Sequence, residues 1–233
     1  MVSKAHRLDR ISYEEMLEMA SQGAKVLQTR SVEMAMQWGV PVLVRSSFDS
    51  PDMPGNADTG EGIGTLVCPE DEIMEQNVVS GIAYARDEAK VTLLKVADKP
   101  GVAARVFGPL SDANINVDMI VQNVSEDGRS TDLTFTVQSS DLDRALEVLK
   151  SAKDEIDYLD LRGATDIAKV SAIGVGMRSH AGVAAQMFSA LAEKGINIEA
   201  ISTSEIKISV LIDAAYAELA VRTLHSLFGL DGA

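Results

Sequence analysis

The sequence predicts an α+β fold built mainly from two ferredoxin-like βαββαβ units, and two observations support this. First, one stretch occurs twice without a gap, at residues 98–120 and 179–201, because Gly182 minus Gly101 and Asn197 minus Asn116 both give 81. Second, each copy has the pattern of a strand end, a glycine turn, an amphipathic helix and a new strand that opens on Ile-Asn-(Val/Ile)-(Asp/Glu). Such a repeat indicates a duplicated supersecondary unit.

Composition limits the possible partners. The 233 residues are enough for two or three small units. The formal net charge of -14 argues against nucleic acid or an anionic membrane surface as partner. No apolar run is long enough to cross a bilayer, and the N-terminus does not have the pattern of a signal peptide, so we expect a cytoplasmic protein. The single cysteine, Cys68, permits neither an internal disulfide framework nor a multi-thiolate metal site.

The first part of the chain, residues 1–70, predicts a truncated α/β arrangement. Ser12 and Glu15 form a capping-box pattern, in which the serine hydroxyl and the carboxylate satisfy free amides at a helix start. The helix should stop near Gly23. Three further elements are predicted here: a helix at 31–38 that ends at Gly39, a buried strand at 40–45 and a surface loop at 46–64.

The two repeated units are predicted to be interleaved in the chain. The first contains a hairpin at 117–124 and 131–138 around a turn at 126–128, then a helix with apolar positions at 142–149. The second contains strands at 170–176, 198–204 and 206–212 and a helix at 216–228, but the chain ends before its last strand. The unassigned strand at 78–84 should complete it, which places Ile82 in the second unit. The predicted domains are therefore 1–70, 85–165, and 71–84 together with 166–233.

The repeated stretch also offers groups for a small ligand. Residues 98–101 and 179–182 lie where a strand passes into a helix, and the free amides of a helix start attract a carboxylate or phosphate. On the adjoining strands, Asn116 with Asp118 and Asn197 with Glu199 supply groups that could hold an ammonium. Amide donors beside carboxylates are typical of a site for a free amino acid.

A structural alternative stays open for these polar residues. Asn116 and Asn197 could cap a turn, with Asp118 and Glu199 solvated. The recurrence of the set in register favours the ligand site, and Gln122 is a further candidate lining residue. We find no nucleophile with a base, no metal-ligand spacing and no Gly-Lys-(Ser/Thr) phosphate loop, so the chain alone resembles a sensor rather than a catalyst.

Longer motifs identify a family. The runs Lys-Pro-Gly-Val-Ala-Ala-Arg-Val-Phe, Ile-Asn-Val-Asp-Met-Ile-Val-Gln-Asn-Val and Asn-Ile-Glu-Ala-Ile-Ser-Thr-Ser-Glu-Ile-Lys-Ile-Ser-Val resemble the tandem ACT domains of bacterial aspartate kinases. The first part of the chain, with Val-Arg-Ser-Ser-Phe, is similar to the end of the amino-acid-kinase domain of these enzymes. The Lys-Phe-Gly-Gly-Thr-like phosphate-binding segment of the family does not occur in the sequence. The resemblance therefore covers the C-terminal part only, as in a fragment or in a regulatory subunit translated from an internal start.

The resemblance implies a function. Enzymes of this family phosphorylate aspartate with ATP and Mg²⁺ in the first step towards lysine, threonine and methionine. We expect this chain to be regulatory only, with no catalytic residue, metal ligand or cofactor of its own, and with a catalytic subunit as one candidate partner. In the family, L-threonine or L-lysine binds between the first ACT unit of one chain and the second of another, so a homodimer is expected. The predicted effector-binding residues are Asp98, Gly101, Val102, Ala103, Asn116, Asp118, Gln122, Ser179, Gly182, Val183, Asn197, Ile198 and Glu199.

The two copies differ in one respect. Gly101 follows Lys90 by 11 residues, whereas Gly182 follows Lys169 by 13, so a second pocket could differ in shape or effector. An alternative function is a stand-alone amino-acid-sensing module that regulates another protein. A ferredoxin-like RNA binder is disfavoured by the acidic charge and by the scarcity of aromatic residues on the candidate strands.

Overall fold

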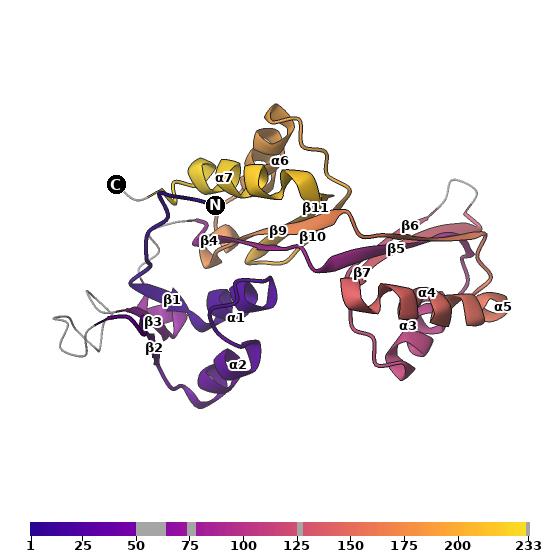
Figure 1. Cartoon of the computed structure of the whole chain (residues 1–233), viewed down its shortest axis with the longest axis horizontal. Helices are drawn as coiled ribbons and strands as arrows, with labels where there is room; N and C mark the ends of the chain where they lie inside the picture. Colours follow the sequence, from indigo (N-terminus) through magenta and orange to yellow (C-terminus); the bar gives the residue numbers. More distant parts are fainter. Residues whose placement is uncertain (50–63, 74–77, 125–127, 232–233) are drawn as a thin grey trace.

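The computed structural model describes residues 1–49, 64–73, 78–124 and 128–231, and it contains three packed parts (Figure 1). These parts are an N-terminal segment (residues 1–70), a first unit and a second unit. Most of the predicted surface loop and most of the predicted 126–128 turn lie outside the described residues. No helix among the described residues is long and apolar enough to cross a membrane.

The N-terminal segment is a small three-stranded sheet with two helices. Its elements are β1 (Arg10–Ser12), α1 (Tyr13–Ser21), α2 (Thr29–Trp38), β2 (Val42–Val44) and β3 (Thr65–Cys68), with strand order β1-β3-β2. The short 3-10 helix η1 (Glu70–Glu72) begins at the last residue of the segment. The capping box is confirmed, since Ser12 accepts from the Glu15 amide and the Glu15 carboxylate accepts from the Ser12 amide. The left-handed Gly39 ends α2 as predicted.

The predicted buried strand at 40–45 is wrong in length and in burial. Only Val42–Val44 are extended, and all three are half-buried, because β2 is the edge strand of the small sheet. Strand β1 was not predicted at all. It has three residues, too few to show an alternating pattern.

The first unit has the predicted βαββαβ order. Its elements are β5 (Glu88–Ala97), α3 (Val102–Asp112), β6 (Val117–Val124), β7 (Ser130–Gln138), η2 (Ser139–Asp141), α4 (Leu142–Ser151), α5 (Lys153–Ile156) and β8 (Asp160–Ala164). The strand order β6-β7-β5-β8 places the first and third strands of the unit at the centre of an antiparallel sheet.

The second unit repeats this sheet with a borrowed strand. Its elements are β4 (Gly81–Ala85), β9 (Ile167–Ile173), η3 (Val175–Arg178), α6 (Val183–Glu193), β10 (Ala200–Thr203), β11 (Lys207–Asp213), η4 (Ala214–Tyr216) and α7 (Ala217–Leu227), in the order β10-β11-β9-β4. Ile82 of β4 pairs with Ala172 of β9, which confirms that the two units are interleaved.

The predicted strand at 170–176 is shifted in the structure. It runs from Ile167 to Ile173 and is followed by Gly174, the N-cap of the 3-10 helix η3. The backbone at residues 78–80 crosses close to this point, and a Cβ on Gly174 would lie 2.4 Å from the Val78 carbonyl oxygen. The crossing chain therefore requires glycine here and ends the strand.

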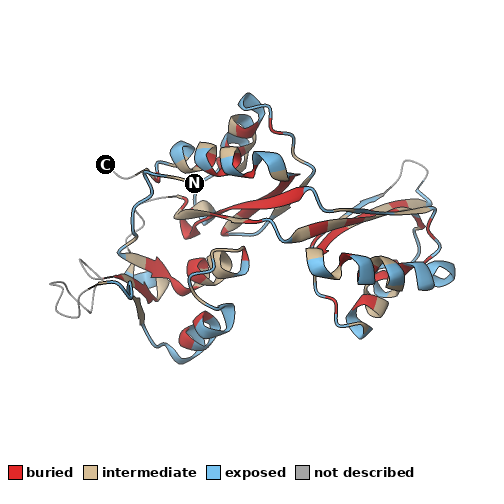
Figure 2. Cartoon of the chain, in the orientation of Figure 1, coloured by how far each residue is buried: buried red, intermediate tan, exposed pale blue. Residues whose placement is uncertain are grey.

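Each unit buries one face of its sheet under two helices (Figure 2). In the first unit, alternate residues of the strands pack on α3 and α4, with Leu110, Phe135 and Leu149 fully buried. In the second unit, Met187 and Leu224 occupy the corresponding core beneath α6 and α7. Apolar residues at every second strand position and along one face of each helix thus form both cores.

The other face of the second sheet is covered by the N-terminal segment. The buried Gln22 at the end of α1 accepts a hydrogen bond from Ser171 of β9, and Ser171 is hydrogen-bonded to Ser209 of β11. The Lys207 ammonium lies 2.9 Å from the Glu18 carboxylate of α1. Polar contacts between buried partners of this kind specify how α1 lies on the sheet.

The two units meet along a small apolar contact. Met119 of β6 is buried with Ile167 and Leu211 of the second unit. The pairing of β6 with β7 shifts register between Asp118 and Val121, and Met119 has a φ of 27°. This bulge directs the Met119 side chain into the junction.

Candidate functional site

The two glycine turns have the same geometry. Gly101 and Gly182 are the N-cap residues of α3 and α6, with φ of 87° and 94°, a left-handed conformation that favours glycine. No side chain caps either helix start among the described residues. Both helix starts therefore present backbone amides and the positive end of a helix dipole to the surroundings.

The predicted residues around the turns fall into two groups. Asp98, Ala103 and Ser179 are exposed, as a ligand-contacting group must be before a ligand arrives. Val102 and Val183 point into the two cores, with 6% and 7% exposure, so only their backbone is available to a ligand.

The polar strand residues lie on the edge strands β6 and β10 or just before them. Asn116, Gln122 and Asn197 are exposed, whereas Ile198 packs against the second core. β6 and β10 contact one another across the junction between the units. The structure thus brings together β6, which carries Asp118, and β10, which follows Glu199 directly.

Asp118 and Glu199 are each paired with a lysine of the other unit. The ammonium of Lys169 on β9 lies 2.6 Å from the Asp118 carboxylate and 2.6 Å from the Glu88 carboxylate. The ammonium of Lys90 on β5 is paired with Glu199. The two lysines occupy corresponding central strands, so the contacts form a pseudo-symmetric cross-brace between the units.

The cross-brace is asymmetric in burial. The Lys169 side chain is 3% exposed, whereas those of Lys90 and Glu199 are 25% and 28% exposed. Burial lowers the pKa of Lys169, but its hydrogen bonds to Asp118 and Glu88, together with their negative charges, raise that pKa above its usual value. Partial burial raises the pKa of Asp118, yet the hydrogen bond and charge of Lys169 bring it below its usual value. Both groups are therefore held in their charged forms.

The remaining predicted residues do not form one pocket within the chain. The turns before α3 and α6 belong to different units, and Figure 1 shows the two helices in separate parts of the molecule. The family resemblance further implies that the first turn of one chain faces residues 197–199 of another, and this stays a prediction. An effector ammonium at Asp118 or Glu199 would have to share these carboxylates with Lys169 or Lys90.

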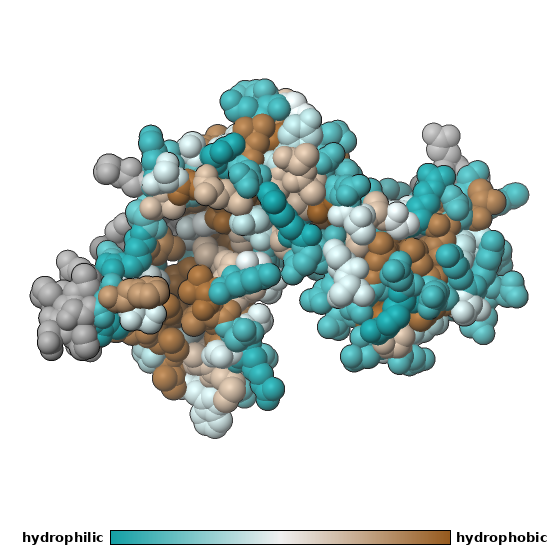
Figure 3. Space-filling model, in the orientation of Figure 1, coloured by the Kyte–Doolittle hydropathy of each residue, from teal (hydrophilic) through white to brown (hydrophobic). Residues whose placement is uncertain are grey.

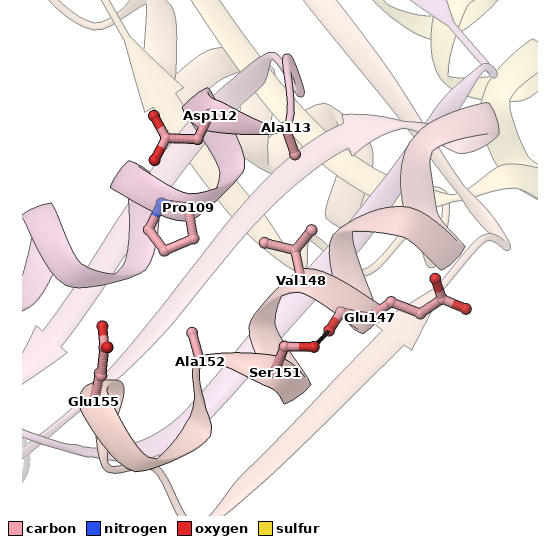
Figure 4. Close-up of a pocket in the computed structure, with 8 residues that line it drawn as sticks. All are labelled: Pro109, Asp112, Ala113, Glu147, Val148, Ser151, Ala152 and Glu155. Carbon is pink, nitrogen blue, oxygen red and sulfur yellow. Dashed lines mark hydrogen bonds between the residues drawn. The ribbon is translucent and has the colours of Figure 1, made fainter.

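A shallow groove lies elsewhere, between the C-terminal parts of α3 and α4 (Figure 4). Its lining residues are Pro109, Asp112, Ala113, Glu147, Val148, Ser151, Ala152 and Glu155. None of them was predicted as a site residue, and the groove is at the opposite end of α3 from Gly101. The described residues contain no group of three His, Cys, Asp or Glu side chains that could hold a metal ion.

Sequence reasoning missed Glu88, Lys90 and Lys169 as functional candidates. A signal was present, because each lysine stands on the strand that leads to a glycine turn. Their ion-pair partners lie in the other unit. A local sequence pattern cannot predict a partner more than 100 residues away, such as Glu199 for Lys90.

Comparisons with known proteins agree with this architecture. Models of the ACT domain match residues 90–154 and residues 170–228, which lie in the first and the second unit. A solved chain described as aspartokinase alpha and beta subunits is 51% identical, with a TM-score of 0.61, and the match covers 65% of this chain and 99% of that one. The chain belongs to the aspartate kinase family.

Other aspartate kinases show how much of the enzyme the chain represents. "Aspartate kinase Ask_LysC" of Stutzerimonas stutzeri is 55% identical over 99% of this chain, which spans 53% of that protein. The ligand-free regulatory subunit from Thermus thermophilus is 44% identical, with a TM-score of 0.61, over 65% of this chain and 99% of the subunit. E. coli aspartokinase III, in a T-state complex with lysine and aspartate, is 29% identical, with a TM-score of 0.71, over 97% of this chain and 47% of that one. The chain thus spans about half the length of the curated relative and all but 1% of the regulatory subunit.

Proposed function

We propose that this chain is the allosteric, feedback-regulated part of an aspartate kinase and that it binds a free amino acid at its ACT units. The observation that carries the proposal is the pair of uncapped, left-handed glycine turns in two ACT units of this family. Helix-start amides suit the carboxylate of an amino acid, and the polar residues of the edge strands suit its ammonium.

Catalysis is proposed to depend on a kinase domain larger than residues 1–70. The N-terminal segment exposes large apolar side chains, with Met34 at 53%, Trp38 at 73% and Phe48 at 98% exposure (Figure 3). Such a surface is expected where a larger α/β domain continues. We propose that ATP, Mg²⁺ and aspartate bind in that larger kinase domain, and that residues 1–70 form its end, whether it belongs to the same chain or to a catalytic subunit.

The effector is proposed to be L-lysine, L-threonine or both. A lysine complex of E. coli aspartokinase III supports the first. We propose a cytoplasmic homodimer in which the first turn of one chain faces residues 197–199 of its partner. An effector that binds one arrangement better shifts the enzyme towards it, and a coupling of about 1–3 kcal/mol is sufficient for feedback.

Ligand-dependent thermal stabilisation tests this proposal. We expect L-threonine or L-lysine to raise the Tm of the chain, because a ligand that binds only the folded state stabilises it. Asp98→Ala and Gln122→Ala should each abolish the threonine-dependent shift. Asp143→Ala, an exposed carboxylate on α4, is the matched control and should leave the shift unchanged. An undiminished shift in both site variants would contradict the site assignment.

A further inference from the structure

The second glycine turn is attached to the N-terminal segment by its two additional residues. The insertion forms η3, and the Val175 amide at its start donates to the Glu15 carboxylate at 3.0 Å. At its end, Arg178 donates to both carboxylate oxygens of Glu70, at 3.1 Å and 2.8 Å. The first unit passes from β5 to Gly101 without such a helix, and Figure 1 shows α3 in the unit that lies away from this segment.

Glu15 is the centre of this attachment. Its side chain is on α1 and only 2% of the residue is exposed. One carboxylate oxygen accepts from the Val175 amide and from the Ser80 hydroxyl at 2.5 Å. The other accepts from the amide and the hydroxyl of Ser12, at 3.2 Å and 3.1 Å. Four donors from three places in the sequence therefore converge on one side chain.

The 3-10 helix η3 leads directly into the second glycine turn, which contains the predicted effector-binding residues Ser179 and Gly182. The His180 ring nitrogen Nδ1 lies 2.8 Å from the Gly176 carbonyl oxygen, and the Ser179 hydroxyl donates to that oxygen at 3.2 Å. Gly182 follows two residues later as the N-cap of α6. A displacement of the turn would therefore act on Gly176 and, through the Val175 amide, on Glu15.

We propose that Glu15 is a positioning residue that couples the second glycine turn to the N-terminal segment. In the capping box, Glu15 stabilises the start of α1. Its contacts with Val175 and Ser80 also join α1 to the chain around the second glycine turn. A ligand that reshapes the second turn would act on α1 directly, whereas a ligand at the first turn would not do so by this route. The inference rests on the proposed regulatory function, and it assigns the two turns different roles in regulation.

A ligand-free experiment can test this coupling. Gly182→Ala and Gly101→Ala are matched perturbations, because both glycines have positive φ and an added Cβ would meet no atom within 3.4 Å. Hydrogen exchange followed by mass spectrometry would report on α1, on residues 174–182 and on α3 in the whole chain. The same variants would then be made together with Glu15→Gln.

Glu15→Gln tests the contact closely because glutamine has the size of glutamate but only one side-chain oxygen that can accept hydrogen bonds. The side-chain NH2 group of the glutamine is itself a donor, and it must face either the Val175 N–H or the Ser12 N–H. One of the two backbone hydrogen bonds is therefore lost. Arg178→Gln is the second relay variant. It removes the surface link to Glu70 without placing a new donor in the buried network.

The outcomes separate coupling from simple packing. We expect Gly182→Ala to speed exchange in α1 at least about five-fold and Gly101→Ala to change it less than about two-fold. In both relay backgrounds, Glu15→Gln and Arg178→Gln, Gly182→Ala should add less change in α1 than in the parent. Equal effects of the two glycine variants on α1, or an undiminished effect of Gly182→Ala in both relay backgrounds, would overturn the proposal. Since no effector is used, the result is independent of whether L-lysine or L-threonine binds.

Discussion

The two ACT units share a sequence repeat and a sheet order but have different surroundings. The face of the first sheet that lies away from α3 and α4 carries half-buried polar residues such as Thr92 and Thr134, whose hydroxyls are 3.2 Å apart. The corresponding face of the second sheet is covered by α1. The two units thus differ in that one face of the second sheet is fixed to the N-terminal segment, whereas α1 does not pack on the first sheet.

The largest expected effect on stability comes from substitutions that create equivalent cavities in the two cores. Leu110 and Leu191 occupy equivalent helix positions and are both 0% exposed. Leu110→Ala and Leu191→Ala should each cost about 2–5 kcal/mol of unfolding free energy, measured by urea denaturation. Hydrogen exchange should show lower protection of α1 only in Leu191→Ala, because α1 packs on the second unit. Equal loss of α1 protection in both variants would contradict the difference between the units.

The cross-brace gives the next largest effect. Lys169→Met leaves the Glu88 and Asp118 carboxylates without their buried cation and should cost about 2–3 kcal/mol, less than for a fully buried pair because Asp118 is partly exposed. Lys90→Met removes the more exposed pair and should cost less than about 1 kcal/mol. Chemical denaturation of both variants measures the difference. Equal costs would show that the burial of Lys169 has no energetic consequence.

Removing the helix cap should have a smaller and more local effect. Ser12→Ala deletes the hydroxyl that accepts from the Glu15 amide at 3.1 Å, and should destabilise α1 by about 1 kcal/mol. Exchange should increase in α1 and in the η3 region while the first unit keeps its protection. Ser139→Ala, in a short helix of the first unit, is the comparison variant and should leave α1 unaffected.

Acid should weaken the junction between the units. Because the folded-state pKa of Asp118 is lowered, its contribution to stability is present above the unfolded pKa of about 3.9 and is lost as the pH falls through the lower folded value. The raised pKa of Lys169 acts in the opposite direction, so its contribution is present below about pH 10.4 and is lost as the pH rises through the higher folded value. Asp118→Asn should flatten the acid limb of a plot of Tm against pH. An identical acid limb in this variant would contradict the role of Asp118.

The sequence predicted those features that depend on local chemistry. The capping box at Ser12 and Glu15, the glycine end of α2 and the βαββαβ order all follow from nearby residues and were confirmed. The borrowed strand was also predictable, because the second copy was one strand short and one strand was unassigned.

Long-range contacts were not predictable in the same way. Glu15 was recognised only as a capping residue, since its contact with Val175 joins positions 160 residues apart. The edge position of β2 was missed because its pairing with β3 joins residues far apart in the sequence, such as Val42 and Val67. The end of β9 at Gly174 depends on the chain crossing at Val78, which the sequence pattern alone cannot show.

Calorimetric titration of the purified chain with L-lysine and with L-threonine tests the regulatory assignment most directly. The account predicts saturable binding of at least one of the two amino acids, and loss of that binding in Asp98→Ala but not in the Asp143→Ala control. No heat of binding with either amino acid, or equal binding by both variants, would contradict the assignment of the first glycine turn as an effector site.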